Sequence, residues 1–313
     1  MKDFISIHDL SASEVKDILA LAADLKEKQQ NKIKHEYLWA KSMAMIFEKP
    51  STRTRVSFEI GMWQLGGLAI NLDQEAIGLG TRESIADVAR TLSRFADAIL
   101  IRTFAHEKVI ELAKYASVPI INALSDQSHP CQALADIFTI IEKKGKDGLK
   151  GLKMAYIGDG NNVCHSLMFA AAKIGLNLVV ATPKGYEPDE KITELALADG
   201  RKAGIEIDIL NDPVVAAKDA DVIYTDVWAS MGQEKEKKKR EKIFKSFQVN
   251  EQLVKLAKPD YIFMHCLPAH RGEEVSTGVI ESQNSVVFDQ AENRLHVQKA
   301  ILVKLLGGEN GQS

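Results

Sequence analysis

The sequence predicts an α/β protein with two Rossmann-like domains, each a parallel sheet flanked by helices. Short apolar runs alternate with segments of helical periodicity along nearly the whole chain, which is typical of such sheets. The chain has 313 residues, and a single hydrophobic core stops growing at about 250 to 300 residues, so two domains are expected. The segment 145–151, which contains three glycines and two lysines, is the best linker candidate.

The first half of the chain is predicted to start with a helix and to continue as strand–helix pairs. Ser11 and Glu14 have the spacing of a capping box, and apolar residues follow at helical intervals up to Leu25. The strands expected next are 43–47, 68–72, 98–101 and 119–123. The helices expected after them are 52–65, 83–95, 107–116 and 131–143. We therefore assign residues 1–145 to the first domain.

The second half repeats this pattern, and we assign residues 151–290 to the second domain. Its expected strands are 154–157, 178–181, 205–210, 222–225, 261–264 and 286–288. The last segment, 292–306, has the periodicity of an amphipathic helix. We expect the C-terminal residues 292–313 to pack back onto the first domain.

Composition excludes several classes of protein. Lys and Arg total 40 and Asp and Glu total 43, so the net charge of −3 provides no general attraction for nucleic acid or anionic membrane. There is no run of about 18 apolar residues and no signal peptide pattern. Cys131, Cys164 and Cys266 are far apart in sequence, as is typical of reduced cytosolic thiols. We expect a cytoplasmic protein without a nucleic-acid or membrane partner.

Ligands of parallel sheets bind at the carboxyl ends of the strands, so the residues after each expected strand are the candidates for a site. The first strand is followed by Ser51-Thr52-Arg53-Thr54-Arg55 at the start of a helix. Hydroxyl groups, free helix N–H groups and two arginines together favour a bound phosphate. A capped helix with arginines that face solvent is the alternative.

Two further strand ends in the first half carry polar residues. Arg102 follows one strand, and His129 and Gln132 stand at the start of the helix after another. An arginine there often only pairs with a neighbouring acid, and a lone histidine is often structural. Because these residues share a sheet edge with Ser51–Arg55, they could hold a phosphate and polarise a carbonyl.

In the second half, the glycine turn 158–162 resembles a dinucleotide fingerprint only poorly, because the third glycine and the ribose-binding acid are missing. Asn162 is better interpreted as a partner of a carboxylate or ammonium group. Asp226 can hold an ammonium group. His265 and Cys266 are neighbours expected on opposite faces of a strand, which argues against a shared zinc or a Cys-His dyad. A buried, inert Cys266 is the alternative, and no metal is expected.

The segment 230–242 ends in a run of mixed charges that reads as a solvated helix face. Because so hydrated a segment makes few apolar contacts, we expect it to be mobile without ligand and to fold over the site.

Taken together, these motifs resemble the aspartate/ornithine carbamoyltransferase family. The resemblance covers nearly the whole chain and includes the segment 226–234 and Glu292-Asn293-Arg294. The phosphate motif and His129-Pro130-Cys131-Gln132 are common to the family. The loop Ser230-Met231-Gly232 and the motif His265-Cys266-Leu267-Pro268 resemble the members that use ornithine.

The resemblance implies transfer of a carbamoyl group from carbamoyl phosphate to the δ-amine of L-ornithine, without a metal or organic cofactor. It assigns the phosphate to Ser51, Thr52, Arg53, Thr54 and Arg102. The carbamoyl group is assigned to His129, Gln132, Arg294 and the backbone of Cys266 and Leu267. Ornithine is assigned to Asn162, Asp226, Ser230 and Met231. The catalytic residues are expected to be Arg102, His129, Asp226 and Cys266. Another amine such as putrescine is the alternative substrate.

The resemblance also implies a homotrimer, with further assembly of trimers left open. In many relatives a Gln or His from the loop before Glu83-Ser84 reaches the neighbouring subunit's carbamoyl phosphate. In this sequence Gly78 stands at that place, and Arg82 could compensate.

Overall fold

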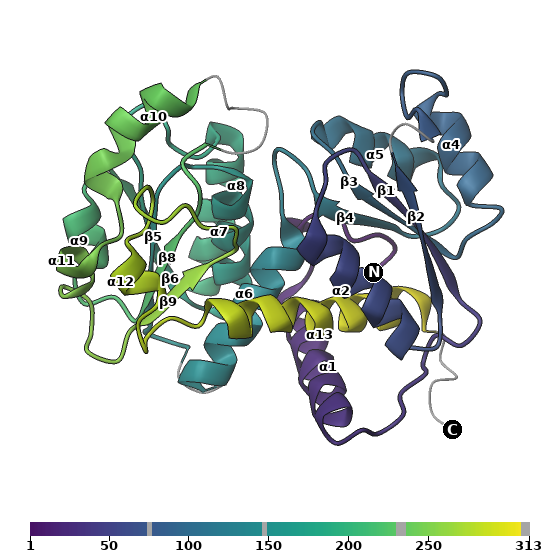
Figure 1. The fold of residues 1–313 in the computed structure, drawn as a ribbon, viewed down its shortest axis with the longest axis horizontal. Coiled ribbons are helices and arrows are strands. Elements are labelled where there is room, and N and C mark those ends of the chain that lie inside the picture. Colours follow the sequence, from purple (N-terminus) through teal and green to yellow (C-terminus); the bar gives the residue numbers. More distant parts are fainter. Residues whose placement is uncertain (74–76, 146–148, 230–235, 308–313) are drawn as a thin grey trace. The chain divides into compact units, whose positions relative to one another are not determined.

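The computed structural model describes residues 1–73, 77–145, 149–229 and 236–307 (Figure 1). The chain divides into two units: unit 1 comprises residues 1–135 and 292–313, and unit 2 comprises residues 136–291. This division falls inside a helix, whereas the sequence suggested a boundary at the segment 145–151. Residues 146–148 of that segment lie outside the described part.

Unit 1 contains a four-stranded parallel sheet in the order β2-β1-β3-β4. Its strands are β1 (Ser42–Phe47), β2 (Leu68–Asp73), β3 (Ala98–Arg102) and β4 (Ile120–Leu124). Helices follow the four strands in turn: α2 (Thr52–Gln64), α4 (Ile85–Leu92), α5 (His106–Tyr115) and α6 (Pro130–Lys144). Each of the predicted strands and helices of this half is therefore confirmed to within a few residues.

The N-terminal segment of unit 1 adds a short bridge beside β4 and a long helix. Phe4 N donates to Ile120 O at 2.8 Å, and Asn122 N donates to Phe4 O at 2.8 Å. Helix α1 (Ala12–Gln30) starts with the predicted capping box, in which Ser11 and Glu14 bond each other's backbone N–H. The capping box was predicted from the sequence, whereas the bridge of Phe4 was not.

Unit 2 contains a five-stranded parallel sheet in the order β7-β6-β5-β8-β9. Its strands are β5 (Lys153–Ile157), β6 (Asn177–Ala181), β7 (Ile207–Leu210), β8 (Val222–Thr225) and β9 (Ile262–His265). Its helices include α7 (Asn162–Ile174), α8 (Glu190–Ala203), α9 (Pro213–Ala217), α10 (Lys237–Phe244), α11 (Glu251–Val254) and α12 (Thr277–Ile280). Two parallel sheets flanked by helices confirm the predicted fold class.

The predicted strand 286–288 is wrong, because helix α13 (Val287–Leu306) already begins there. Only the preceding residues pair with the sheet: Phe263 N donates to Asn284 O at 2.8 Å, and Val286 N donates to Phe263 O at 3.0 Å. The short apolar run resembled a strand, but three apolar residues cannot be assigned from periodicity alone.

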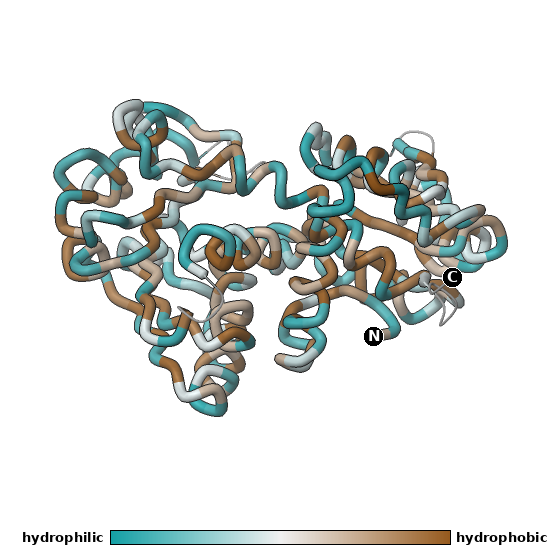
Figure 2. The backbone as a smooth tube through the Cα atoms, turned by 90° about the horizontal axis from the view of Figure 1, so that it is seen from below, coloured by the Kyte–Doolittle hydropathy of each residue, from teal (hydrophilic) through white to brown (hydrophobic). Residues whose placement is uncertain are grey.

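Each sheet is buried among its own helices. Apolar residues of β5, β8 and β9 form one cluster with residues that follow β9, and residues of β1, β3 and β4 form another with α4 and α5. Figure 2 shows hydrophobic and hydrophilic stretches alternating along the backbone, with hydrophilic residues on many of the outer turns. None of the described helices is long and apolar enough to cross a membrane.

Candidate active site

In both sheets the strand order reverses at a point where sequence-predicted polar residues gather. In unit 1 the chain continues from β1 to β2 on one side, and from β3 to β4 on the other. In unit 2 the same reversal occurs between β5 and β8. Ligands of open parallel sheets bind at the carboxyl ends of the strands at such reversal points. Each unit therefore has its own candidate binding edge.

At the edge of unit 1, Ser51 caps helix α2. Its Oγ accepts a hydrogen bond from Thr54 N at 3.2 Å, and the first helical turn contains no acidic residue. The positive end of the helix thus has no carboxylate of its own to neutralise it. Arg55, however, forms an ion pair with Glu59 at 2.9 Å. This leaves Arg53 as the arginine of the motif that is suited to an anion.

A buried hydrogen-bond network connects helix α2 to helices α6 and α13. Arg294 Nη1 donates to Gln132 Oε1 at 2.6 Å, and Arg294 Nη2 donates to Thr54 Oγ1 at 3.3 Å. The third nitrogen, Nε, donates to Gln298 Oε1 at 2.8 Å. The structure therefore brings together Thr54, Gln132 and Arg294, and it fixes a buried guanidinium next to the start of α2. Gln298 was missed by the sequence reasoning.

His129 lies buried among positive charges. Burial is the main reason that its pKa falls well below the usual value, and the charges of Arg294, Arg102 and Arg53 lower the pKa further. The imidazole is therefore neutral near pH 7, and a neutral imidazole can donate a hydrogen bond to a carbonyl oxygen. Cys131 beside it is buried too, which raises the pKa of its thiol to about 12 and makes it an inert thiol.

Glu48 is a buried acid at this edge that the sequence reasoning missed. It accepts hydrogen bonds from the Thr103 hydroxyl and from Lys108 Nζ, the latter at 2.6 Å. Its backbone N–H donates to Arg102 O at 2.9 Å. Glu48 therefore fastens the end of β1 to the end of β3, where the buried Arg102 lies. The signal available in the sequence was an acidic residue directly after a predicted apolar strand.

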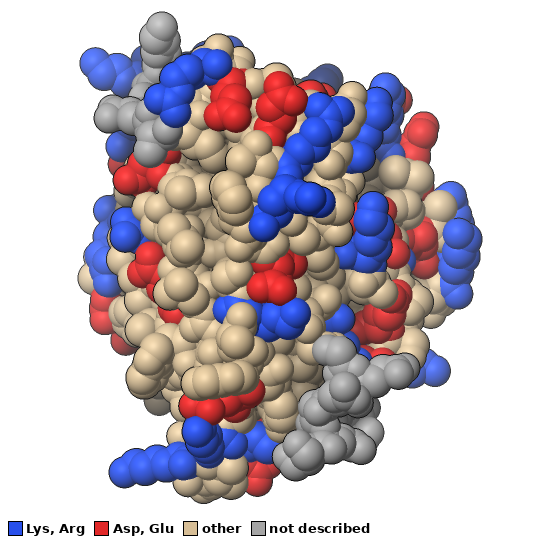
Figure 3. All heavy atoms as spheres, turned by 90° about the vertical axis from the view of Figure 1, so that its right-hand side faces the viewer, with Lys and Arg blue, Asp and Glu red and all other residues tan. Residues whose placement is uncertain are grey.

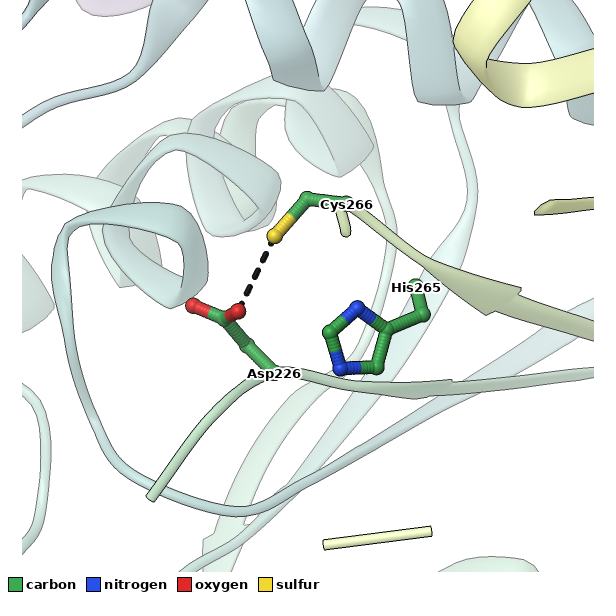
Figure 4. A group of neighbouring side chains, drawn as sticks. All are labelled: Asp226, His265 and Cys266. Atoms are coloured by element: carbon green, nitrogen blue, oxygen red, sulfur yellow. Dashed lines mark hydrogen bonds between the residues drawn. The ribbon is translucent and has the colours of Figure 1, made fainter. Parts of the chain in front are cut away.

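At the edge of unit 2, the carboxylate of Asp226 is held from two directions. Cys266 Sγ donates to Asp226 Oδ1 at 2.9 Å, and Asn161 Nδ2 donates to Asp226 Oδ2 at 2.7 Å (Figure 4). Asn161 also caps helix α7 by accepting from Val163 N and Cys164 N. The structure thus brings Asp226 and Cys266 together. The sequence reasoning missed Asn161 and chose Asn162, which is the first residue of α7.

The expectation that His265 and Cys266 lie on opposite faces of a strand was wrong. Strand β9 ends at His265, so the alternation of a strand does not extend to Cys266. The possible ligand atoms of these two residues and Asp226 all lie within 4.8 Å of one another (Figure 4).

This geometry by itself does not make a metal site. Leu267 N donates to His265 Nδ1 at 2.8 Å, so this nitrogen is an acceptor and the other must carry the proton. His265 Nε2 then donates to Glu274 Oε1 at 3.2 Å. Both ring nitrogens are bonded within the protein, and a metal would have to displace one of these bonds. The expected lack of a metal stays a prediction.

The glycine turn after β5 is filled by the protein itself. A Cβ atom on Gly160 would lie 2.3 Å from Pro188 N, and Gly160 N donates to Tyr186 O at 2.9 Å. This glycine therefore serves the close packing of the turn against the segment 186–188. The observation disfavours the dinucleotide interpretation of this motif.

Asp159 in the same turn pairs with Arg240 of helix α10, at 2.9 Å from Arg240 Nη1 to Asp159 Oδ2. Burial raises the pKa of Asp159 to about 6, although Arg240 opposes this effect. Neither residue was among the candidates from the sequence.

The predicted segment 230–242 is only partly described. Ser230 and Met231, two of the expected ornithine ligands, lie outside the described residues, together with residues 232–235. The expectation of few contacts is wrong for 237–242, since this part forms helix α10 with a buried Arg240 and the helix ends at the buried Phe244.

Comparison with known protein families matches both halves of the chain. Residues 2–142 match the carbamoyl-P binding domain of aspartate/ornithine carbamoyltransferase, and residues 150–305 match the Asp/Orn binding domain of the same family.

Individual relatives match over nearly their full length. An ornithine carbamoyltransferase from Anoxybacillus flavithermus is 59% identical over 305 residues, which is 97% of this chain and 96% of that protein. One from Thermococcus kodakarensis is 58% identical over 98% of this chain and 97% of that protein. The solved structure of the Pyrococcus furiosus ornithine carbamoyltransferase has a TM-score of 0.95 at 59% identity, covering 98% of this chain and 97% of that one. Since both halves match one family and well over half of the positions are shared with its members, the chain belongs to the aspartate/ornithine carbamoyltransferase family.

Proposed function

We propose that the protein transfers the carbamoyl group of carbamoyl phosphate to the δ-amine of L-ornithine, giving L-citrulline and phosphate. The observation that carries this proposal is the buried, neutral His129 beside Arg53, Arg102 and Arg294. Three cations suit a doubly charged phosphate, and a neutral imidazole suits the carbonyl next to it. Relatives that are 58 and 59% identical to this chain are named ornithine carbamoyltransferases.

In this proposal, carbamoyl phosphate binds with its phosphate at the start of helix α2. Its phosphate ligands are Ser51, Thr52, Arg53, Thr54 and Arg102. The carbamoyl group bonds to His129, Gln132, Arg294 and the backbone of Cys266 and Leu267. Leu267 has a φ of +56°, a conformation that leucine rarely adopts and that is often found at binding sites. Arg102 and His129 stabilise the oxyanion that forms when the carbonyl carbon is attacked.

Ornithine binds at the edge of unit 2. Asp226 and Ser230 take its α-ammonium group, and Asn162 and the backbone of Met231 take its carboxylate. The carboxylate of Asp226 is already oriented by Asn161 and Cys266. This arrangement supplies one fixed negative charge for the ammonium group.

The reaction forms a bond between the δ-nitrogen of ornithine and the carbonyl carbon, and it breaks the bond from that carbon to the phosphate oxygen. An alkylammonium with a pKa of ~10.4 must first lose a proton, which costs about 4.6 kcal/mol at pH 7. We propose that Cys266 and Asp226 orient the amine and help to remove this proton. Cys266 forms no covalent intermediate, so no carbamoyl-thioester should be trapped there.

We also propose the assignment of domains and the assembly. Residues 1–145 with the helix that ends the chain form the carbamoyl phosphate-binding domain, and residues 151–290 form the ornithine-binding domain. The protein acts as a cytoplasmic homotrimer without a cofactor. The family models matched by the two halves, which are described as carbamoyl-P binding and Asp/Orn binding, support this division.

The test is an assay of the purified protein with carbamoyl phosphate and four acceptors: ornithine, putrescine, aspartate and acetylornithine. We expect citrulline from ornithine, with kcat/KM at least ~100-fold above that for putrescine, because putrescine would leave Asp226 and the carboxylate ligands unpaired. Turnover that is faster with putrescine or aspartate would reassign the substrate. Binding of carbamoyl phosphate without any turnover would indicate a binding protein instead of an enzyme.

A further inference from the structure

Arg240 differs from the other cations in its part of the chain because its charge is buried. The side chain belongs to helix α10, and only 7% of the residue is exposed. Its neighbours Lys238 and Lys239 are exposed. Burying a guanidinium is costly unless hydrogen bonds and opposite charges compensate for the lost water. The partners of Arg240 therefore indicate what the buried charge achieves.

These partners come from three other segments of unit 2 and from the N-cap of helix α10 itself. Arg240 Nη1 lies 2.9 Å from Asp159 Oδ2, after strand β5, and donates to Trp228 O at 2.8 Å, after strand β8. Arg240 Nε donates to Glu236 Oε2 at 3.2 Å. The guanidinium also lies over the ring of Tyr186, 4.8 Å from its centre. A planar guanidinium can make all these contacts at once, whereas a lysine ammonium group has neither the fork nor the flat face.

Two of the segments held by Arg240 lead directly to Asp226. Trp228 stands two positions after Asp226 in the chain. Asp159 stands two positions before Asn161, whose side chain bonds Asp226 at 2.7 Å. The hydroxyl of Tyr156 reinforces this turn by donating to Asp159 O at 2.8 Å. Arg240 thus holds the segment that carries Asp226 and the turn that carries Asn161, which is one of the two partners of the Asp226 carboxylate.

We propose that Arg240 is a positioning residue for ornithine, which sets the place and orientation of the Asp226 carboxylate without touching the substrate. This inference rests on the proposed function, because it requires Asp226 to receive the α-ammonium group. A role in anchoring helix α10 alone is the competing explanation. The two roles differ in what they affect: positioning changes the KM for ornithine, whereas anchoring changes only the stability of unit 2.

The experiment compares Arg240→Lys and Arg240→Gln with the matched control Lys239→Gln, which removes one exposed charge from the same helix. We expect the KM for ornithine to rise ~10-fold in Arg240→Lys and more in Arg240→Gln, because each loses bonds that a charged donor makes. The KM for carbamoyl phosphate should stay within about twofold, and the control should match the wild type. Unchanged ornithine KM values, or equal rises for both substrates, would overturn the proposal.

A second pair of variants tests the proposed route through Asp159. Asp159→Asn should raise the ornithine KM, and the double variant Asp159→Asn, Arg240→Gln should raise it no further than Arg240→Gln alone. If the increases in ornithine KM of the two single variants multiply in the double variant, the two residues act separately, and the proposed role of Arg240 through Asp159 is contradicted. Arg240→Lys keeps the charge, so this variant still provides the test if Arg240→Gln fails to fold. Absence of citrulline from the wild-type protein would instead reject the proposed function itself.

Discussion

The amino group of Lys299 is fully buried in unit 1, among neutral partners. Lys299 Nζ donates to Gln29 Oε1 at 2.9 Å and to Gln64 Oε1 at 2.8 Å, and it lies 3.2 Å from His35 Nε2. His35 Nδ1 lies 2.7 Å from Ile33 O, which leaves its Nε2 free to accept from Lys299. Burial lowers the pKa of Lys299 from 10.5 to about 8. As the pH rises, the folded protein therefore loses this proton at a lower pH than the unfolded chain does.

This difference predicts how stability responds to alkaline pH. Between pH 8 and 10.5 the unfolded chain binds more protons at this position than the folded protein, so the free energy of unfolding should rise with pH. We expect the difference in the free energy of unfolding between the wild type and Lys299→Met to change by up to ~3 kcal/mol in favour of the wild type across this window. Urea unfolding of both proteins at several pH values measures it. A gap that stays constant with pH would contradict the lowered pKa.

Arg53 and Arg55 are two positions apart, but only Arg55 has an acidic partner on its own helix. Arg53→Ala should weaken carbamoyl phosphate binding by about 1.5 to 3 kcal/mol, the usual contribution of a hydrogen bond to a charged group. Arg55→Ala is the matched control and should leave binding nearly unchanged. Calorimetric titration with carbamoyl phosphate compares the two. Equal losses in both variants would mean that the binding depends on net charge and not on a specific contact.

At the scale of single elements, most strands and helices could be predicted because buried strands and amphipathic helices have different periods. Helix α13 begins five residues before its predicted start, since the first turn looked like a short strand. Helix α10 was read as a solvated segment, since nothing in a run of Lys and Glu marks one arginine as buried. Such assignments depend on tertiary contacts that local sequence does not contain.

The cap of helix α7 connects an element to the site, and it yields a prediction at this scale. Asn161 accepts from the first N–H groups of α7 and donates to Asp226. Asn161→Ala should cost ~1 kcal/mol of stability for the lost cap and should also raise the KM for ornithine.

Asn250→Ala is the control for the loss of a cap, because Asn250 caps helix α11 in the same way with Gln252 N and Leu253 N. This variant should lose similar stability but keep the wild-type KM. Thermal unfolding and steady-state kinetics of both variants separate the two effects. An Asn161→Ala protein with an unchanged KM would show that the bond to Asp226 does not matter for the substrate.

At the scale of the whole molecule, sequence motifs indicated the family and most of the site residues, but not how these residues are paired. Thr54 and Arg294 are 240 positions apart, and Gln132 and Arg294 are 162 positions apart. The network between them exists only because helices α2, α6 and α13 pack in unit 1. Similarly, the contact of Arg240 with Asp159 requires the folded turn after β5. Motifs identify which residues matter, and tertiary packing decides which of them touch.

The surface of unit 1 supports the proposed trimer. On helix α2, Val56, Ile60 and Trp63 are exposed, and on the edge strand β2, Leu68 and Ile70 are exposed. Figure 3 shows this end of unit 1 with a broad area of uncharged residues between scattered charged ones. Adjacent exposed apolar side chains on a helix and an edge strand are typical of a protein interface. A second copy of the chain would cover them in a cyclic assembly.

The local backbone conformation explains why a glycine stands at position 78, and this bears on the proposed assembly. Its φ is +61°, and its O accepts from the N–H groups of Thr81, Arg82 and Glu83. A Cβ atom at Gly78 would lie only 2.7 Å from Arg82 Cβ. A longer side chain at this position would therefore strain a tight turn. Arg82 remains the candidate for a contact with the carbamoyl phosphate of the neighbouring subunit.

Mixed trimers test this contact. Arg53→Ala and Arg82→Ala should each inactivate a trimer made of one kind of subunit. In a cyclic trimer, however, a site whose own subunit keeps Arg53 can receive Arg82 from its neighbour. Random mixing of equal amounts should complete about one quarter of all sites, so ~25% of the wild-type activity should return in the mixture, and about one third should be found in purified mixed trimers. Mixing is done by refolding the two variants together, with one carrying a tag so that mixed trimers can be purified.

As a control, Arg53→Ala mixed with Arg102→Ala should recover nothing, since both residues serve the same subunit's site. Lack of recovery in purified mixed trimers with Arg82→Ala would exclude a contact across the interface, and the activity of the Arg82→Ala protein alone would then show whether Arg82 matters at all.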